Sequence, residues 1–213
     1  MGRLVRPTIP NFDGFGRPVS GNRDAGYLLD LCYNQRRKVY GMAVRTVVLY
    51  PDDPLTQRAE PVIDFGPELA AFVEDLFDTM VAYEGVGLAA PQVGVSKRIF
   101  VMHPPEGERL CLVNPEIVEA EGRAEAEEGC LSLPRIYAVV PRATRIRVRA
   151  YTVEGQPLDF VATDYPARII QHEYDHLEGI LFPDRLDILT RESVLREWEK
   201  VRAELAAVSA QRR

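Results

Sequence analysis

Residues 171–176 read Gln171-His172-Glu173-Tyr174-Asp175-His176 and contain an H-E-x-x-H pattern. Residues four positions apart lie on the same face of a helix, so His172 and His176 can bind one metal ion with the Glu173 carboxylate beside it. The ordinary alternative is a pair of surface histidines on an acidic helix. Residue frequencies alone would produce the H-E-x-x-H pattern by chance in roughly one chain in a hundred of this size. The spacing favours the metal site.

Start and stop signals on both sides predict that the motif lies within a helix. Asp164 is a favourable N-cap residue, Pro166 suits a first turn, and Gly179 is a typical helix terminator. Apolar residues between these signals provide a face that can be buried: Ile169, Ile170, Tyr174 and Leu177.

Five other segments are predicted strands because they contain β-branched or alternating apolar residues. They are residues 44–50, 98–103, 109–113, 145–151 and 158–162. Glu154-Gly155 is the expected turn between the last two strands.

Two more helices complete the predicted fold. The first begins at Pro67 and ends near Gly85. The second begins near Thr190 and has an apolar stripe at four-three-four-three spacing, which favours packing on the body of the protein. The stripe consists of Val194, Trp198, Val201, Leu205 and Val208. This order predicts an α+β fold, with mostly antiparallel sheets around a central metal-binding helix that carries H-E-x-x-H, an N-terminal helix and a C-terminal helix.

Composition is typical of one globular domain with tails, because the chain has 213 residues of which 46% are hydrophobic. No apolar run approaches the roughly 18 residues that a membrane span needs, and residues 1–7 lack the apolar core of a signal peptide. Three scattered cysteines, Cys32, Cys111 and Cys130, argue against a disulfide framework and favour a reducing cytosol. The net charge of −6 gives no indication of nucleic-acid binding.

The chain divides into three predicted parts. Residues 1–41 are a basic, Gly- and Pro-rich extension, with seven Arg or Lys against three Asp, that we expect to be poorly ordered. The extension is either an interaction or targeting arm or an artefact of start-codon choice, because Met42 directly precedes a predicted strand. Residues 42–189 form the catalytic body, and residues 190–213 form the last helix.

A catalytic metal needs a third protein ligand and one open position. Downstream of the motif the candidates are four ordinary acids: Glu178, Asp184, Asp187 and Glu192. Upstream, Cys130 lies in the glycine-containing segment Glu128-Gly129-Cys130-Leu131-Ser132, where close backbone approach to a metal or ligand is possible. The alternative for Cys130 is a small buried hydrophobic residue, which is the commonest role of a free cysteine.

A third segment, Gly85-Val86-Gly87-Leu88-Ala89-Ala90-Pro91-Gln92, is rich in small residues. Small residues let a backbone pass close to another group, although a simple helix-to-strand connection explains the same composition.

Together the three segments resemble the peptide deformylase family, whose motifs are G-φ-G-φ-A-A-x-Q, E-G-C-φ-S and Q-H-E-φ-D-H, where φ is hydrophobic. Residues 85–92, 128–132 and 171–176 match them completely and in order. The resemblance covers about residues 43–187 and explains neither the N-terminal extension nor the last helix.

The resemblance implies a role for each matching position. Cys130, His172 and His176 would bind one divalent metal ion, with iron(II) favoured and zinc as the alternative. Glu173 would be the general base and acid. The oxyanion hole would consist of Gln92 and the backbone N–H of Leu131. Three further residues would line the substrate groove and pair with an extended peptide: Val86, Gly87 and Gly129.

The implied reaction is removal of the formyl group from N-formylmethionyl nascent peptides. A divalent metal lowers the pKa of a bound water, which makes hydroxide available near neutral pH. Donors at the oxyanion hole stabilise the developing charge, and Glu173 transfers the proton to the leaving amine. Formate and a free N-terminus are the products.

Two positions outside the motifs are further candidates for substrate contact. Tyr137 aligns with a position at which some family members have a substrate-contacting arginine, and the nearby Arg135 is a possible substitute. Ile169, one turn before His172, is placed either to line the pocket for the methionine side chain or to pack in the core.

Other functions stay open at this point. An H-E-x-x-H peptidase would take its third ligand from downstream, and a structural metal site would need a fourth ligand. For the deformylase, the resemblance adds ribosome contact near the exit tunnel through the C-terminal region, with no sequence-specific nucleic-acid binding and no membrane. The expected location is the cytoplasm of a bacterial-type cell, with import into an organelle as the alternative.

Overall fold

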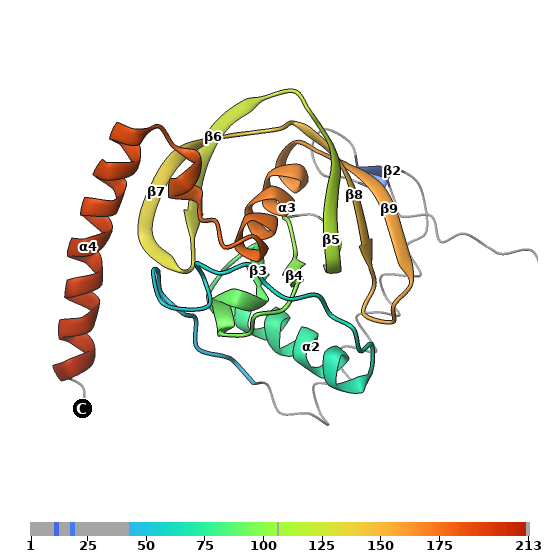
Figure 1. The fold of residues 1–213 in the computed structure, drawn as a ribbon, viewed down its shortest axis with the longest axis horizontal. Coiled ribbons are helices and arrows are strands. Elements are labelled where there is room, and N and C mark those ends of the chain that lie inside the picture. The colour runs from blue at the N-terminus through green and yellow to red at the C-terminus, as the bar shows by residue number, and fades with distance from the viewer. Residues whose placement is uncertain (1–10, 13–17, 20–42, 106, 212–213) are drawn as a thin grey trace, which may run out of the picture.

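Antiparallel sheets and three α-helices make up the computed structural model, which describes residues 11–12, 18–19, 43–105 and 107–211 (Figure 1). The predicted α+β class with antiparallel sheets is confirmed. Most of the predicted extension 1–41 lies outside the described residues, which include only the short paired strands β1 (Asn11–Phe12) and β2 (Pro18–Val19) from it.

The main sheet has five antiparallel strands in the order β3-β4-β5-β8-β9. They are β3 (Gly87–Ala89), β4 (Ile99–Met102), β5 (Leu110–Glu121), β8 (Arg145–Tyr151) and β9 (Pro157–Thr163). Four of the five predicted strands are confirmed as β4, β5, β8 and β9, although β5 extends further than its apolar core indicated. The short β3 lies at one edge of the sheet.

The predicted strand at residues 44–50 is wrong. This segment is extended but forms no strand. Its backbone bonds elsewhere: the N–H of Val48 donates to the carbonyl of Gln92 at 2.8 Å, and the N–H of Tyr50 donates to the carbonyl of Ser132 at 3.0 Å. Val47 is buried and Val48 packs against the core without a strand partner, whereas Val44 is exposed.

A separate hairpin, which the sequence did not predict, consists of β6 (Ala124–Cys130) and β7 (Leu133–Arg142). Leu131 and Ser132 form the turn between them. β6 is composed largely of Ala and Glu, which are uncommon in strands. β7 contains Ile136, Val139 and Val140, which favour a strand, but its two prolines argue against one. Figure 1 shows the curved hairpin between α3 and α4.

The main sheet packs a helix on each face. α2 (Pro67–Ala82) packs against one face with Ile99 and Val101, and α3 (Asp164–Leu177) packs against the other with Phe100 and Met102. This division follows from the strand period of two, because successive side chains point to opposite faces.

The helix signals around α3 are nearly correct. Gly179 follows the end of the helix with a φ of 71°, as expected for a glycine terminator. The N-cap is Thr163 instead of the predicted Asp164, which is the first residue of the helix. α2 ends at Ala82, with Tyr83 as its C-cap, so its stop falls just before the predicted Gly85.

The last helix, α4 (Ile188–Gln211), lies against β7 (Figure 1). Val194, Trp198 and Val201 are buried, and the indole N–H of Trp198 donates to the carbonyl of Tyr50 at 3.0 Å. The predicted stripe fails at Val208, which is 48% exposed because the helix continues beyond the surface it covers. None of the helices in the described ranges is both long and apolar enough to span a membrane.

Candidate active site

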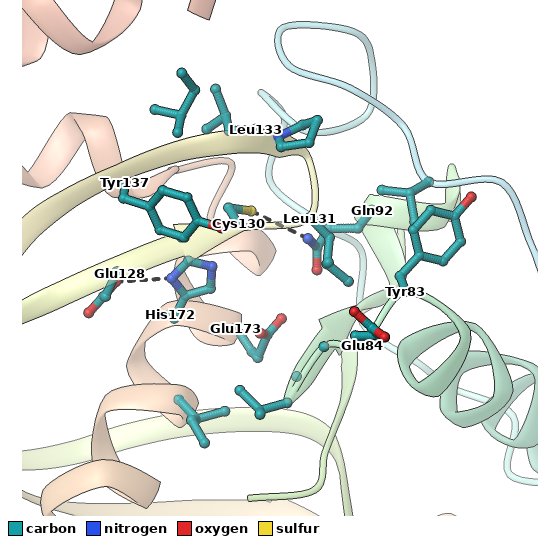
Figure 2. A pocket seen from close by; sticks show the side chains of 18 of the residues that line it. Tyr83, Glu84, Gln92, Glu128, Cys130, Leu131, Leu133, Tyr137, His172 and Glu173 are labelled. Atoms are coloured by element: carbon teal, nitrogen blue, oxygen red, sulfur yellow. Dashed lines mark hydrogen bonds and ion pairs between the residues drawn. The ribbon is translucent and has the colours of Figure 1, made fainter. Parts of the chain in front are cut away.

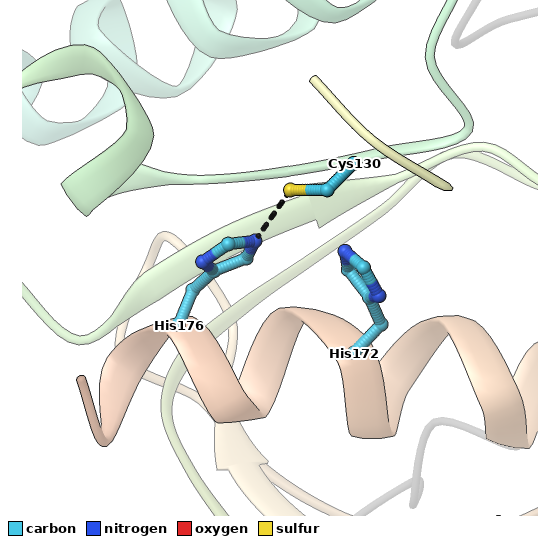
Figure 3. A group of neighbouring side chains, drawn as sticks. All are labelled: Cys130, His172 and His176. Carbon is cyan, nitrogen blue, oxygen red and sulfur yellow. Dashed lines mark hydrogen bonds between the residues drawn. The ribbon is translucent and has the colours of Figure 1, made fainter. Parts of the chain in front are cut away.

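Three potential metal ligands converge between α3 and the end of β6. His172 and His176 project from the same face of α3, and Cys130 lies opposite them (Figure 3). The Cys130 Sγ is 3.2 Å from the His176 Nε2, and the ligand atoms of all three side chains lie within 4.8 Å of one another. Within the described part of the chain, this is the one group of three residues that could hold a metal ion.

The donor set fits a catalytic metal ion. One thiolate and two imidazoles suit zinc or iron(II), and three protein ligands leave a position open for water or substrate. The four downstream acids do not reach this site. They bond elsewhere: Glu178 to Arg98, Asp184 to Arg191, Asp187 to Thr190 and Glu192 to Arg196.

Glu173 lies next to the ligands and is 4% exposed. Burial raises the pKa of its carboxyl group to about 7. Its Oε2 atom is buried and accepts no hydrogen bond from any described residue. A buried oxygen without a partner is costly unless a ligand or water supplies one, so this oxygen indicates a position for a reacting group.

Gln92 and Leu131 lie beside Cys130. Gln92 belongs to the short helix η1 (Ala90–Val93), and its Oε1 accepts the backbone N–H of Ala89 at 2.8 Å. That bond directs Nε2 toward the Cys130 Sγ, 3.5 Å away (Figure 2). Leu131 follows Cys130 in the hairpin turn. Both candidate oxyanion donors therefore adjoin the candidate metal ligands.

These residues line one cavity of about 680 Å³, within the usual range for ligand sites. All of the predicted site residues line it except His176, which is 1% exposed and lies behind it. In Figure 2, Tyr137 lies on one side of the cavity, and Tyr83 and Glu84 lie on the other. Residues from distant parts of the sequence thus form a single groove.

Comparison with known proteins decides the family. Residues 44–192 match the family model for polypeptide deformylase. The chain belongs to this family. Deformylases of this family are metal-dependent hydrolases that remove the N-terminal formyl group from nascent peptides.

Individual relatives agree with this assignment. A peptide deformylase of Acidobacterium capsulatum is 46% identical over 165 residues, which cover 75% of this chain and 96% of that protein. A solved deformylase of Legionella pneumophila has a TM-score of 0.73 and 41% identity, covering 77% of this chain and 98% of that one. A deformylase structure from Thermus thermophilus has a TM-score of 0.71 and 44% identity, and the match covers 80% of this chain and 100% of that one.

A buried ion network contacts one of the candidate metal ligands, His172. Glu128, 7% exposed, accepts hydrogen bonds from Arg142 at 3.0 and 2.9 Å and from Arg168 at 2.6 Å. Its Oε2 lies 3.0 Å from the His172 Nδ1. Burial alone would raise the pKa of Glu128, but hydrogen bonds from His172 and Arg142 outweigh it and lower the pKa to about 2. The carboxylate therefore orients His172 so that Nε2 is free for a metal.

Sequence reasoning assigned no role to this network. Arg142 also pairs with Asp175 at 2.5 Å, and Arg185 pairs with the same carboxylate. Glu128 and Asp175 belong to the family motifs, so the motifs are the sequence signal that could have identified them. No sequence signal marked Arg142 or Arg168.

Two glycines permit close contacts across the groove. A Cβ on Gly87 would lie 2.3 Å from the Glu173 Oε1, and a Cβ on Gly129 would lie 2.6 Å from the Tyr137 ring. Tyr137 is 62% exposed and packs on Gly129, which is its neighbour in the hairpin register. Ile169 both lines the cavity and packs in the core.

Gly87→Ala tests whether the glycine is required for the position of Glu173. The new methyl group must displace the carboxylate, so we expect kcat/KM for formate release to fall at least about 100-fold, the effect of misplacing a catalytic group by about 1 Å. Metal content by elemental analysis should stay near one ion per chain. The control is Gly66→Ala, where a Cβ meets nothing within 4 Å. Equal activity of the two variants would contradict the prediction.

Glu128→Gln tests the support of His172. Loss of the carboxylate weakens the hydrogen bond to Nδ1. It also removes the charge partner of Arg168 and one of the two charge partners of Arg142. We expect zinc affinity, measured by chelator competition, to fall about 10- to 100-fold. Glu125→Gln on the same strand is the control, because Glu125 is exposed and pairs only with Arg123 among the described residues. An unchanged zinc Kd in a folded Glu128→Gln variant would rule out this role.

Proposed function

We propose that this chain deformylates N-formylmethionyl peptides at the groove lined by Cys130, His172 and Glu173. The observation that carries the proposal is the convergence of three metal-ligand atoms within 4.8 Å beside a buried carboxylate oxygen that has no partner among the described residues. The family assignment names the reaction, and this geometry supports the assignment of its parts to individual residues.

Cys130, His172 and His176 would hold the metal ion. Iron(II) is the metal we propose, following the family resemblance, and zinc suits the same thiolate and imidazole donors. When bound, a divalent ion lowers the pKa of a coordinated water, so that hydroxide is available near neutral pH.

Glu173 acts as the general base and then as the general acid of the reaction. Water adds its oxygen to the formyl carbon while its proton passes to the Glu173 carboxylate. The C–N bond of the formamide then breaks, and Glu173 returns the proton to the leaving amine. Formate and a free methionine amine result. The position of Glu173 against Gly87 keeps its carboxyl group at the cavity wall.

Gln92 and Leu131 stabilise the negative charge that develops on the formyl oxygen. The Gln92 amide is held by the Ala89 N–H, so its Nε2 donor faces the site before substrate binds. The second donor is the Leu131 backbone N–H in the hairpin turn. A pre-oriented donor of this kind typically contributes about 3 kcal/mol to lowering the barrier.

The peptide binds in an extended conformation between two strand edges. β3 is an edge strand of the main sheet, and β6 pairs only with β7 in the described part of the chain. Val86 and Gly87 on one side and Gly129 on the other offer backbone groups for strand-like pairing. The methionine side chain points toward Ile169, and Tyr137 contacts the peptide where the ring packs on Gly129.

Formate release from a formyl-Met-Ala-Ser peptide tests this assignment. We expect protein prepared anaerobically with iron(II) to release formate. Glu173→Ala should retain the metal but lose at least about 100-fold in rate, because general acid–base catalysis typically contributes 10²–10⁴-fold.

Cys130→Ser separates this site from a peptidase with downstream ligands. We expect the variant to lose the metal or bind it far more weakly, as measured by elemental analysis. Metal retention by Cys130→Ser, with undiminished activity of Glu173→Ala, would contradict the assignment of both residues.

We further propose that the exposed face of α4 contacts the ribosome in a bacterial-type cytoplasm, where nascent chains arise and a free thiol persists. Deleting residues 190–213 would remove the buried Trp198 and expose the core that it covers. Substitutions are therefore the better test. The double variant Arg196→Glu, Lys200→Glu changes only exposed positions. We expect it to lose ribosome co-sedimentation at low salt while keeping peptide deformylation. Unchanged co-sedimentation would rule out this contact.

A further inference from the structure

The groove has a wall that the deformylase motifs do not include. Five apolar residues of its lining come from three segments that are far apart in the sequence. These residues are Leu49, Leu133, Pro134, Ile136 and Leu205. Leu205 is the single contribution of α4 to the described lining of the cavity.

Packing shows that this wall is distinct from the proposed methionine pocket. Val86 and Ile169 pack in the cluster between α3 and the main sheet. Leu133 and Leu205 instead pack in the cluster formed with Trp198 of α4. Cys130 packs in this second cluster as well and also lines the cavity, so the apolar wall adjoins the reaction centre on its other side.

Leu205 is held in position. Val201 and Trp198, one and two turns earlier in α4, are buried against the body. Glu204, adjacent to Leu205, forms an ion pair with Arg135 at 2.5 Å, which joins α4 to the start of β7. Arg135 lines the cavity, but its charge is paired with Glu204. An acidic substrate side chain would therefore have to compete for this arginine, whereas an apolar one meets the partly exposed Leu49, Pro134 and Leu205.

We propose that Leu205 completes a distal subsite that binds an aliphatic side chain of the nascent peptide downstream of formylmethionine. The inference rests on the proposed function. It makes α4 part of substrate recognition and predicts that the enzyme distinguishes longer peptides by their sequence. The subsite contacts substrate and takes no part in the chemical step.

A leucine scan of the substrate tests the subsite. The substrates are formyl-Met-Ala-Ala-Ala-Ala and the three peptides in which leucine replaces alanine at the third, fourth or fifth position. For the wild type, one position should raise kcat/KM about 10-fold over the all-alanine peptide, the lower end of the effect of apolar groups in a pocket. Leu205→Ala should reduce this ratio to about 2-fold or less.

Two variants separate recognition from structural support. Val208→Ala lies on the same helix, at a position that is 48% exposed and outside the cavity lining, and should keep the 10-fold ratio. Leu205→Arg should move the preference at that position from leucine to glutamate, which loss of structure alone cannot produce. An unchanged ratio in Leu205→Ala, or a wild type without any leucine preference, would overturn the subsite.

A second measurement keeps the test independent of turnover. A formyl-Met peptide with benzoylphenylalanine at the preferred position, or at each of the three scanned positions in turn, should photo-crosslink to the fragment that contains Leu205. Absence of formate with every peptide would reject the proposed function itself. Crosslinking only to fragments outside α4 and the start of β7 would reject the subsite, whatever the activity.

Discussion

The carboxylate of Glu128 is the contact on which the geometry of the site depends. It lies on β6 and bonds to Arg142 on β7 and to Arg168 and His172 on α3. A buried charge is tolerated only when it is paired and hydrogen-bonded, so these groups must meet in one arrangement. The register of the hairpin and the rotation of α3 are thereby set together. Cys130, two residues beyond Glu128 on the same face of β6, then comes within 3.2 Å of His176.

Two glycines without side-chain atoms shape the two sides of the groove. Glu173 and Tyr137 each occupy the space that a Cβ would need, at Gly87 and Gly129 respectively. The two glycines also lie on strand edges that face the cavity. Close packing and backbone exposure thus have the same origin, because a residue without a side chain admits a neighbour on one side and leaves its peptide groups open to a substrate.

The cluster that anchors α4 connects the C-terminal helix to the reaction centre. It contains Trp198, Cys130 and Phe182, and the Phe182 ring stacks on His172 with a centroid distance of 6.5 Å. The helix α4, which lies outside the family motifs, therefore shares an apolar cluster with Cys130 and is linked to His172 through the Phe182 ring. The apolar cluster that anchors α4 thus includes both Cys130 and Leu205 of the proposed subsite, which is a physical reason for the chain to keep this helix beside β7.

Local patterns determined much of this protein from sequence alone. The H-E-x-x-H spacing, its helix stop at Gly179 and the alternation in β8 depend on neighbours within a few residues, and these were predicted correctly. The segment at residues 44–50 was wrongly predicted as a strand, because its backbone bonds to Gln92 and Ser132 instead of to a strand.

Only the tertiary structure decided which residues share the site. Sequence left Cys130 and four downstream acids as competing ligands, and the fold brings Cys130 to the histidines while the acids pair elsewhere. Arg142 and Arg168 had no motif to mark them. Their positions follow from long-range packing and charge pairing, which depend on contacts between distant residues and leave no periodic pattern in the chain.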